Sequence, residues 1–532
     1  MNFKYNIQTH RSEEALKLIN SDVFVKQWRQ LAVGLPVYCR MQEAEMLCVW
    51  YRHYSVIFEP VIFTAFNDSD ELIGFIGMVW DEKAQELRHA GHPQYHGWLA
   101  KPADEVHFLK QVLRYIRDEF PIRKILWSVL PPGLSIEVIQ SALSSDMHLT
   151  CEETVSPLWS LQTSERLQKI LKNKSIKSNF NRYKRRGDLR FEIINEPEHL
   201  RKVLHVAKNQ IDFRNEAVNN VLPFKSDPIK IEYYCEQILV PGTILPVALW
   251  LDDQLLSFNM GVMSDNYFKG RITSFDPSEY RNSPGTLLFI RLSEYLTEQG
   301  FEIFDLSPGL NSYKDRFADT SVKLYKPTIH FSNITYQKTL LKQQLVKGSR
   351  KLLIDKFGIN IKNTRKWQTN LAELPQKINK IRKSKIRLNI TKGIPSFNQP
   401  KLIHLERSNL PPANAKQVKI QEYEDLLKYS GTHPFLTRRG LLIDAMKKFA
   451  NGDILYSVAD DEKLLWYVWR KKAKGEIKLN NNSFPIEKEG VLLYDFYQSY
   501  SLNGEGFINN ISEIIPLLDL QDVDNIYLIE TA

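Results

Sequence analysis

The chain has few cysteines and no apolar segment long enough to cross a bilayer. Its 532 residues include four cysteines, Cys39, Cys48, Cys151 and Cys235, and none is spaced from another as in a metal-binding pair. This scarcity argues against a disulfide framework and favours a reducing compartment. No run of about 18 apolar residues occurs, and the first residues lack the charged-then-apolar pattern of a secretory signal. We therefore expect a soluble, cytoplasmic protein.

Histidines that could suggest a metal centre are also poorly placed. His89, His92 and His96 lie close together, but Pro93 argues against a helix that would align the last two. No cysteine or acidic partner stands at helical spacing from them. We expect a loop that lines a cleft between domains, and no bound metal.

Positive charge is concentrated in one segment. Between Lys338 and Lys392 the chain has sixteen Lys and Arg residues and only two acidic residues, Asp355 and Glu373. This segment therefore has a net charge of +14, and the rest of the chain has −5, which together give the net charge of +9. We predict a basic helical linker over 336–400. The first interpretation is a solvated spacer. The second is contact with an anionic membrane leaflet, which would make the protein peripheral to the inner membrane. Nucleic acid, as tRNA, comes third because aromatic residues are scarce in the segment.

The middle of the chain contains a meander of predicted strands. Ile244–Leu251, Leu255–Met263 and Tyr267–Phe275 are separated by turns at Asp252–Asp253 and Ser264–Asn266. A buried strand before a nucleotide-binding helix of the Rossmann type would stand alone. The pattern therefore indicates an antiparallel sheet that leads into a helix.

That helix has specific boundary residues. Ser283 is a good N-cap, Pro284 suits the first helical position, and Gly300 can end the helix. The first turn offers unpaired backbone N–H groups, and Gly285 has no side chain to block an anion. A strand over Glu302–Leu306 follows. We predict a pyrophosphate site formed by the following residues: Arg281, Asn282, Ser283, Gly285 and Thr286.

Motifs in this region resemble the CelD/BcsL-type family of GNAT acyltransferases, which is associated with cellulose and exopolysaccharide biosynthesis. The resemblance rests on Tyr280-x-x-Ser283-Pro284-Gly285-x-Leu287-Leu288, Gly300, Asp305 and Gly309-x-x-x-Tyr313-Lys314-x-x-Phe317, and upstream on 180–191. It covers roughly residues 20–330. It implies an acyl-CoA-dependent N- or O-acyltransferase. The related Fem-type transferases, which have paired GNAT domains, use aminoacyl-tRNA instead.

The predicted order of elements occurs three times along the chain. A hairpin over Pro60–Val79, a helix over Asp104–Glu119 and a strand over Lys124–Leu130 make the first copy. The third copy has strands from Ile454 to Tyr497, a helix over Phe507–Leu518 and a final strand over Ile526–Ile529. The fold class is therefore α/β (α+β), with tandem GNAT-like domains, each a mixed, mostly antiparallel twisted sheet flanked by helices. The predicted domains are 1–160, 161–335, the linker 336–400 and 401–532.

Only the middle copy has a helix start suited to a pyrophosphate. The first copy carries Asp104 and Glu105 there, which would repel phosphate. The third has Asn503-Gly504-Glu505-Gly506, which lacks a basic residue. We expect no cofactor in the first domain, and we interpret the third as a degenerate accessory copy.

Two aspartates and a Tyr-Lys pair are the candidate catalytic residues. Asp276 follows the third meander strand and is either a general base or the start of an ordinary Asx-turn. Asp305 ends an apolar strand, where a charge is costly unless paired. It is either functional or a buried carboxylate that orders the next loop through Lys314 or Arg316.

By the family resemblance, Tyr313 can protonate the leaving thiolate, and Lys314 can hold a phosphate, an acceptor carboxylate or the oxyanion. The alternative is that Tyr313 packs and Lys314 is solvated. A basic cluster over 169–186, which includes Phe180 and Tyr183, is either a solvated helix face or a contact for a nucleotide, sugar phosphate or phospholipid head group.

These observations favour an acyl-CoA-dependent N- or O-acyltransferase that acts by direct transfer on a sugar, nucleotide-sugar or exopolysaccharide precursor. The donor, acetyl-CoA or a longer acyl-CoA, is the one cofactor expected. A Fem-type transferase and a non-catalytic scaffold of a polysaccharide assembly are the alternatives.

Overall fold

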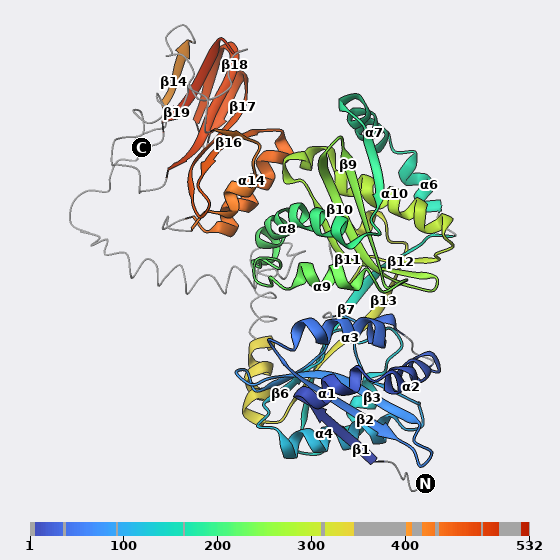
Figure 1. Ribbon diagram of the computed structural model, residues 1–532. Coiled ribbons are helices and arrows are strands. Elements are labelled where there is room, and N and C mark those ends of the chain that lie inside the picture. The colour runs from blue at the N-terminus through green and yellow to red at the C-terminus, as the bar shows by residue number, and fades with distance from the viewer. Residues whose placement is uncertain are drawn as a thin grey trace, which may run out of the picture. The chain divides into compact units, whose positions relative to one another are not determined.

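A computed structural model describes residues 6–35, 39–91, 94–162, 165–309, 314–344, 401–406, 418–430, 436–479, 482–498 and 523–530. The chain divides into two compact units. Unit 1 comprises Met1–His205, Asp227–Thr273 and Thr286–Asn363; unit 2 comprises Val206–Ser226, Ser274–Gly285 and Thr364–Ala532. Figure 1 shows the helices and strands of both. The mixed α/β architecture agrees with the predicted fold class.

Unit 1 contains one long mixed sheet whose first half is an antiparallel meander. Hydrogen-bonded neighbours follow the order β1-β2-β3-β4-β6, with bounds Asn6–Arg11, Glu59–Phe66, Leu72–Asp81, Glu86–His89 and Lys124–Leu126. β4 and β6 are parallel, because the helix α4 (Glu105–Glu119) connects them. β6 is shorter than the predicted strand Lys124–Leu130.

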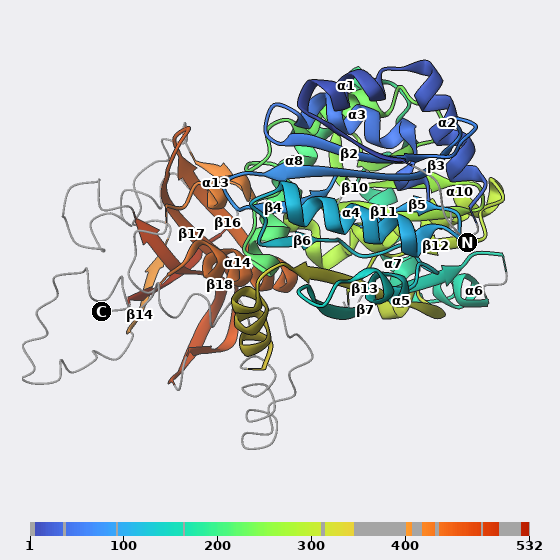
Figure 2. The same cartoon turned by 90° about the horizontal axis from the view of Figure 1, so that it is seen from below.

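Helices cover both faces of this half. α1 (Ser12–Ile19), α2 (Asp22–Val33) and α3 (Ala44–Tyr54) lie on one face, and α4 lies on the other (Figures 1 and 2). α4 buries Phe108, Leu109, Val112, Leu113 and Ile116, which recur at helical spacing and pack into the core with β2 and β3.

The second half of the sheet repeats the first. Its order is β12-β11-β10-β9-β8, with bounds Ile303–Asp305, Tyr267–Phe275, Gln254–Ser264, Ile244–Leu251 and Leu189–Ile193. β11 and β12 are parallel and joined through the helix α10 (Pro284–Glu298). The predicted strands Ile244–Leu251 and Tyr267–Phe275 are confirmed to the residue, and Gly300 follows α10 with a positive φ of 84°.

The two halves exchange their last strands. β7 (His148–Ser160) comes from the first half but pairs with β12, and β13 (Thr320–His330) comes from the second but pairs with β6. β13 also pairs with β7 along its whole length, over 148–158 of β7. The halves are therefore tied into one continuous sheet, which sets how β12 meets residues of the first half.

A second sheet forms most of unit 2 and has the same arrangement, an antiparallel meander followed by a parallel return strand. Its order is β14-β19-β18-β17-β16-β15, with bounds Lys401–Glu406, Asn525–Glu530, Asn482–Gln498, Leu464–Leu479, Ile454–Ala459 and Lys419–Ile420. β16, β17 and β18 form the predicted meander, and β19 returns parallel to β18. The predicted helix Phe507–Leu518 and the segment Asn503–Gly506 lie outside the described residues.

Two segments from the middle of the chain complete unit 2. Its core joins Phe213 and Ala217 of α8 (Pro197–Asn219) to residues of α14 (Arg438–Asn451), β16 and β17. α14 also packs on η2 (Pro277–Asn282), the short 3₁₀ helix before α10. The loop that leads into the predicted pyrophosphate site is thus built together with the C-terminal sheet.

Candidate active site

Asp305, at the end of β12, is the centre of a buried polar cluster in unit 1. Its side chain is 0% exposed. Oδ2 accepts hydrogen bonds from the Tyr95 hydroxyl at 2.5 Å, the Tyr267 hydroxyl at 2.6 Å and the Lys269 ammonium at 3.3 Å. Oδ1 accepts from the Ser156 hydroxyl and, at 2.7 Å, from the Ser307 backbone N–H. These donors come from both halves of the sheet, so the cluster joins them.

The charges in this cluster are arranged to keep Asp305 ionised. Burial raises the pKa of Asp305, but Lys269 and the hydroxyl donors outweigh it, so the pKa lies below its ordinary value. Burial and the nearby carboxylate raise the pKa of Tyr95 and of Tyr267. Both phenols therefore stay protonated and donate. Lys269, 2% exposed, also lies 3.4 Å from the centroid of the Tyr95 ring.

This geometry gives Asp305 a positioning role. With both oxygens saturated by donors and no exposed surface, it orients Tyr95, Tyr267 and Lys269 and orders the turn at Ser307. The prediction that it orders the following loop agrees with the Ser307 contact. The partner differs: the cation is Lys269, not Lys314 or Arg316, because the burial of β11 brings Lys269 under the carboxylate.

β11 and β12 separate immediately beyond this cluster. Their paired register runs from Tyr267 with Ile303 to Lys269 with Asp305 and ends there, although β11 continues to Phe275. The Ser307 hydroxyl, at a positive φ of 68°, donates to the Gly270 carbonyl at the point of separation. The polar cluster therefore lies where the pairing of the two parallel strands ends.

The start of α10 has the features expected of a phosphate-binding helix end. Pro284 is its first residue, and Ser283 before it has φ 53° and ψ 51°. Ser283 thus occupies the predicted N-cap position, but in the left-handed conformation, which turns successive backbone N–H groups inward. Gly285 and Thr286 are partly exposed, so their N–H groups can be reached. These residues fit the pyrophosphate of an acyl-CoA.

Two predicted cofactor-binding residues make local contacts within unit 2. The Asn282 amide donates to Glu279 at 2.7 Å. A Cβ added at Gly452, the residue after α14, would meet the Arg281 guanidinium at 2.8 Å. Arg281 therefore lies at the C-terminal, electronegative end of α14, which stabilises a cation.

Asp276 takes the Asx-turn geometry that was one of its two interpretations. It is 7% exposed, and its Oδ1 accepts from the backbone N–H of Ser278 at 2.8 Å and from the Ser278 hydroxyl at 2.6 Å. Tyr423, whose pKa is raised by burial and then by Asp276, lies nearby in the same unit. The role of Asp276 as a base stays a prediction.

Lys314 is buried, contrary to its interpretation as a solvated cation. It is 4% exposed, and its ammonium donates to the Ser307 carbonyl at 2.7 Å and the Pro308 carbonyl at 3.4 Å. It thereby fixes the turn that follows Asp305. Tyr313 lies outside the described residues.

Several residues of the cluster carry no signal in the sequence. Tyr267 and Lys269 alternate with apolar residues along β11 and look like a solvent-facing strand edge. Tyr95 stands 210 positions before Asp305. One available signal was Asp305 itself, since a carboxylate at the end of an apolar strand demands partners.

The histidine segment forms a stack, and no metal site was found among the described residues. The rings of His89 and His96 are 4.9 Å apart, and burial lowers the pKa of His89 to about 4. His92 lies outside the described residues. Across the described part of the chain, no group of three or more potential metal ligands occurs, and no helix is long and apolar enough to span a membrane.

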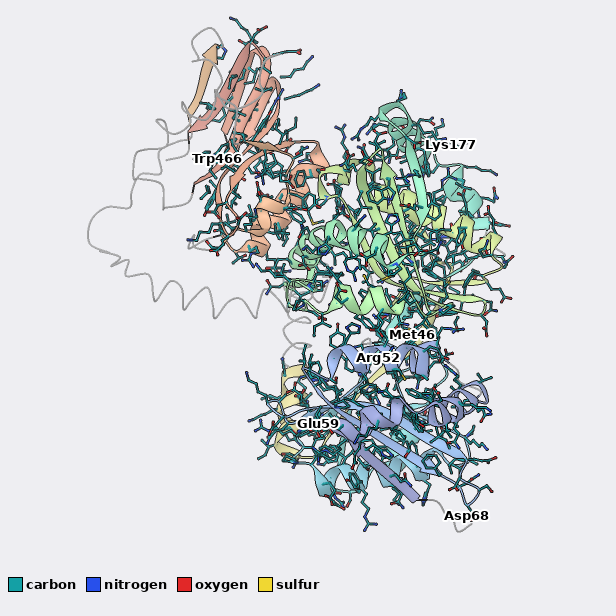
Figure 3. The ribbon with its side chains drawn as sticks, in the orientation of Figure 1. Met46, Arg52, Glu59, Asp68, Lys177 and Trp466 are labelled. Atoms are coloured by element: carbon teal, nitrogen blue, oxygen red, sulfur yellow. The ribbon has the colours of Figure 1, made fainter. Side chains whose placement is uncertain are left out.

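The basic cluster borders a cavity that α10 also lines. This cavity of about 380 Å³ is lined by residues of α6 (Glu165–Leu171), α7 (Lys174–Arg186), the link between them and α10: Leu171, Lys172, Ile176, Lys177, Phe180, Arg291 and Glu294. The Arg291 guanidinium stacks over Phe180 at 5.3 Å. Figure 3 marks Lys177 on α7.

A family model described as an acetyltransferase (GNAT) domain matches residues 172–315. The match includes β11, α10, β12 and the Asp305 side chain. No curated protein matches the chain.

Three of the solved structures to which the chain is similar are the following. The C-terminal domain of a lysylphosphatidylglycerol synthetase from Agrobacterium fabrum has a TM-score of 0.39 and 14% identity, over 60% of this chain and 95% of that one. A tandem GNAT protein from the clavulanic acid biosynthesis pathway has 0.39 and 12%, over 61% and 98%. FemX has 0.39 and 10%, over 59% and 98%.

The segment that the family model matches contains the β-meander, the helix α10 and the parallel return strand β12. Residues 172–315 form an acetyltransferase (GNAT) domain, and the protein is an acyltransferase.

Proposed function

We propose that the protein transfers an acyl group from acyl-CoA directly to an amine or hydroxyl of a sugar, nucleotide-sugar or exopolysaccharide precursor. The observation that carries this proposal is the β11–α10–β12 unit: an open helix start lies between two parallel strands that separate beside a buried, ionised Asp305. GNAT domains use acyl-CoA as donor.

In this proposal, the first turn of α10 holds the pyrophosphate. The backbone N–H groups of Gly285 and Thr286 and the helix dipole would bind its charge, with Ser283 shaping the approach. When bound, the donor supplies an activated thioester. The chain contributes orientation and a water-poor cluster at the point where the pairing of β11 and β12 ends.

The buried cluster can offer donors only through Lys269, because the single O–H of Tyr95 and of Tyr267 is already donated to Asp305. Asp305 holds the Lys269 ammonium in a fixed position through one of its three N–H groups. A fixed ammonium stabilises negative charge that develops on a carbonyl oxygen, because it needs no reorganisation during the reaction. Tyr313 keeps its predicted role as proton donor to the thiolate, and Asp276 its predicted role as base.

The acceptor class rests on the family resemblance, and the location of the protein follows from it. A polysaccharide precursor is assembled at the cytoplasmic membrane face, and the basic segment 336–400 would favour peripheral contact with anionic lipid. A tRNA-dependent Fem-type transferase and a non-catalytic scaffold are the competing functions.

Calorimetric titration of the full chain with acetyl-CoA and longer acyl-CoAs tests the proposal. Gly285→Glu places a carboxylate at the start of α10 and should abolish binding through charge repulsion and obstruction. Ala103→Glu adds the same charge two residues before α4, where residue 103 is exposed, and should leave binding unchanged.

Three outcomes contradict the proposal. Binding of charged tRNA with no binding of any thioester would favour the Fem-type function. Failure of both donors would favour the scaffold. Equal loss in both variants would show that the effect of Gly285→Glu is not local to α10.

A further inference from the structure

Arg271 follows Lys269 on the same face of β11, just beyond the point where β12 separates. Alternate residues of a strand share a face, so Lys269, Arg271 and Thr273 form one row about 7 Å apart. Lys269 has Asp305 as its counter-ion. Arg271 has no carboxylate partner among the described residues. The row therefore carries one neutralised and one unneutralised cation.

The Arg271 side chain is enclosed by aromatic residues of α9 (Lys230–Gln237). Its guanidinium lies 5.4 Å from the centroid of the Tyr234 ring, and it hydrogen-bonds the side chain of Tyr233. Tyr233 is 3% exposed and Tyr234 is 2% exposed. This setting removes the guanidinium from bulk water while leaving part of its hydrogen-bonding capacity unused.

The unused hydrogen-bond donors of Arg271 can be named. The Nε and Nη1 atoms of Arg271 are buried and have no hydrogen-bond partner within the described part of the chain. Together they carry three N–H groups. A buried donor without a partner typically costs about 1–3 kcal/mol, more when it is charged. Such a cost is tolerated at binding sites, where a ligand supplies the missing acceptors.

A second side chain, on the neighbouring strand β10, also has a buried polar atom without a hydrogen-bond partner among the described residues. Asn259 of β10 is 1% exposed, and its amide donates to the Thr273 hydroxyl at 2.9 Å. Its Oδ1 has no partner among the residues described. Asn259 therefore offers an acceptor, beside the same row of β11, that a ligand hydroxyl or amine can use.

We propose that Arg271, assisted by Asn259 and Tyr233, binds an anionic group of the acceptor substrate. The group is a carboxylate or a phosphate, because only such groups offer several acceptor oxygens and a compensating charge. The acceptor is thus an acidic or phosphorylated sugar whose hydroxyl or amine reacts beside Asp305. This inference rests on the proposed acyl transfer and names the acceptor class for it.

The test compares three probes that share a hexose ring: glucose 1-phosphate, glucuronate and neutral glucose. Each is titrated calorimetrically into the full chain saturated with a non-transferable CoA thioether. We expect glucose 1-phosphate or glucuronate to bind more tightly than glucose. The arm that binds identifies phosphate or carboxylate as the recognised group.

Arg271→Gln should weaken binding of the anionic probe at least tenfold, since a charged hydrogen bond contributes about 1.5–3 kcal/mol. It should leave glucose unaffected. Arg190→Gln is the matched control, because Arg190 also stacks on an aromatic ring, that of Trp250, but lies on the surface. Arg271→Gln should also unfold at the same or a higher temperature, since it removes buried donors that lack partners.

Anionic probes that bind wild type and Arg271→Gln equally, or that bind neither, overturn this inference. A marked loss of stability in Arg271→Gln would assign Arg271 a structural role. In each case normal acyl-CoA binding to wild type preserves the proposed function, and its absence overturns that function separately.

Discussion

Asp305→Asn should strongly destabilise unit 1. The substitution removes the charge that compensates the Lys269 ammonium, 3.3 Å from Asp305 Oδ2. It also replaces one acceptor oxygen with an N–H₂ group that must face hydroxyl or backbone donors. Asp305 is 0% exposed and Lys269 is 2% exposed. Water therefore cannot solvate the unpaired ammonium or the unmatched N–H₂ group unless the core opens.

The magnitude follows from the type of interaction. Breaking one partner of a buried ion pair costs about 3–5 kcal/mol. For a large domain, 1 kcal/mol corresponds to roughly 2–4 °C in melting temperature, so we expect a loss of roughly 10 °C. Denaturant unfolding followed by tryptophan fluorescence, together with calorimetry, measures both quantities.

The double variant Asp305→Asn, Lys269→Met separates the pair from the rest of the cluster. Removing the cation as well should recover about 2 kcal/mol or more, because the stranded charge is gone. The reasoning is refuted if Asp305→Asn lies within about 1 kcal/mol of wild type, or if the double variant is as unstable as the sum of the singles.

Three further predictions concern neighbouring features. Gly261→Ala should lower the free energy of unfolding by about 1–3 kcal/mol, because the new Cβ would lie 2.3 Å from the Phe268 ring. Gly270→Ala should be tolerated, because its Cβ would have no contact closer than 3.4 Å. Equal melting temperatures for the two variants would contradict this prediction. Burial, and after it the nearby carboxylates, raise the pKa of Glu43 from the ordinary value of 4.5 to about 8. The folded protein therefore favours the protonated carboxyl, and its free energy of unfolding falls as the pH rises from 4.5 towards 8. Glu43→Gln should therefore differ little from wild type at pH 5 and unfold at a higher temperature than wild type at pH 9; no gain at pH 9 would be the contrary result. Phe213→Ala should lower the unfolding free energy of unit 2 by about 3–5 kcal/mol and weaken acyl-CoA binding, because the loop before α10 belongs to that unit. Calorimetry that shows unchanged acyl-CoA binding in the folded variant would contradict the second part of this prediction.

Local signals in the sequence located the main elements of the acyltransferase domain. Apolar strands bounded by acidic turns predicted β9 and β11 to the residue, and Pro284 and Gly300 bounded α10. These features depend on neighbouring residues, so they are readable without the fold. The same applies to the Asx-turn at Asp276.

Long-range pairing was not readable in this way. The exchange of β7 and β13 depends on residues more than 100 positions apart in the chain. Lys269 and Arg271 have the alternation of a solvent-facing strand. Lys269 is buried and Arg271 is half-buried because the loop that carries Tyr95 and the helix α9 contact them. Arg281, predicted as a phosphate contact, lies against Gly452, whose position depends on unit 2.

Hydrogen–deuterium exchange with and without acetyl-CoA tests the central claim most directly. The account predicts that the donor protects the backbone amides at the start of α10, residues 285–288, and leaves the corresponding amides at the start of α4, residues 105–108, unchanged. Protection absent from α10, or equal at both helix starts, would contradict a single acyl-CoA site in the second half of the sheet.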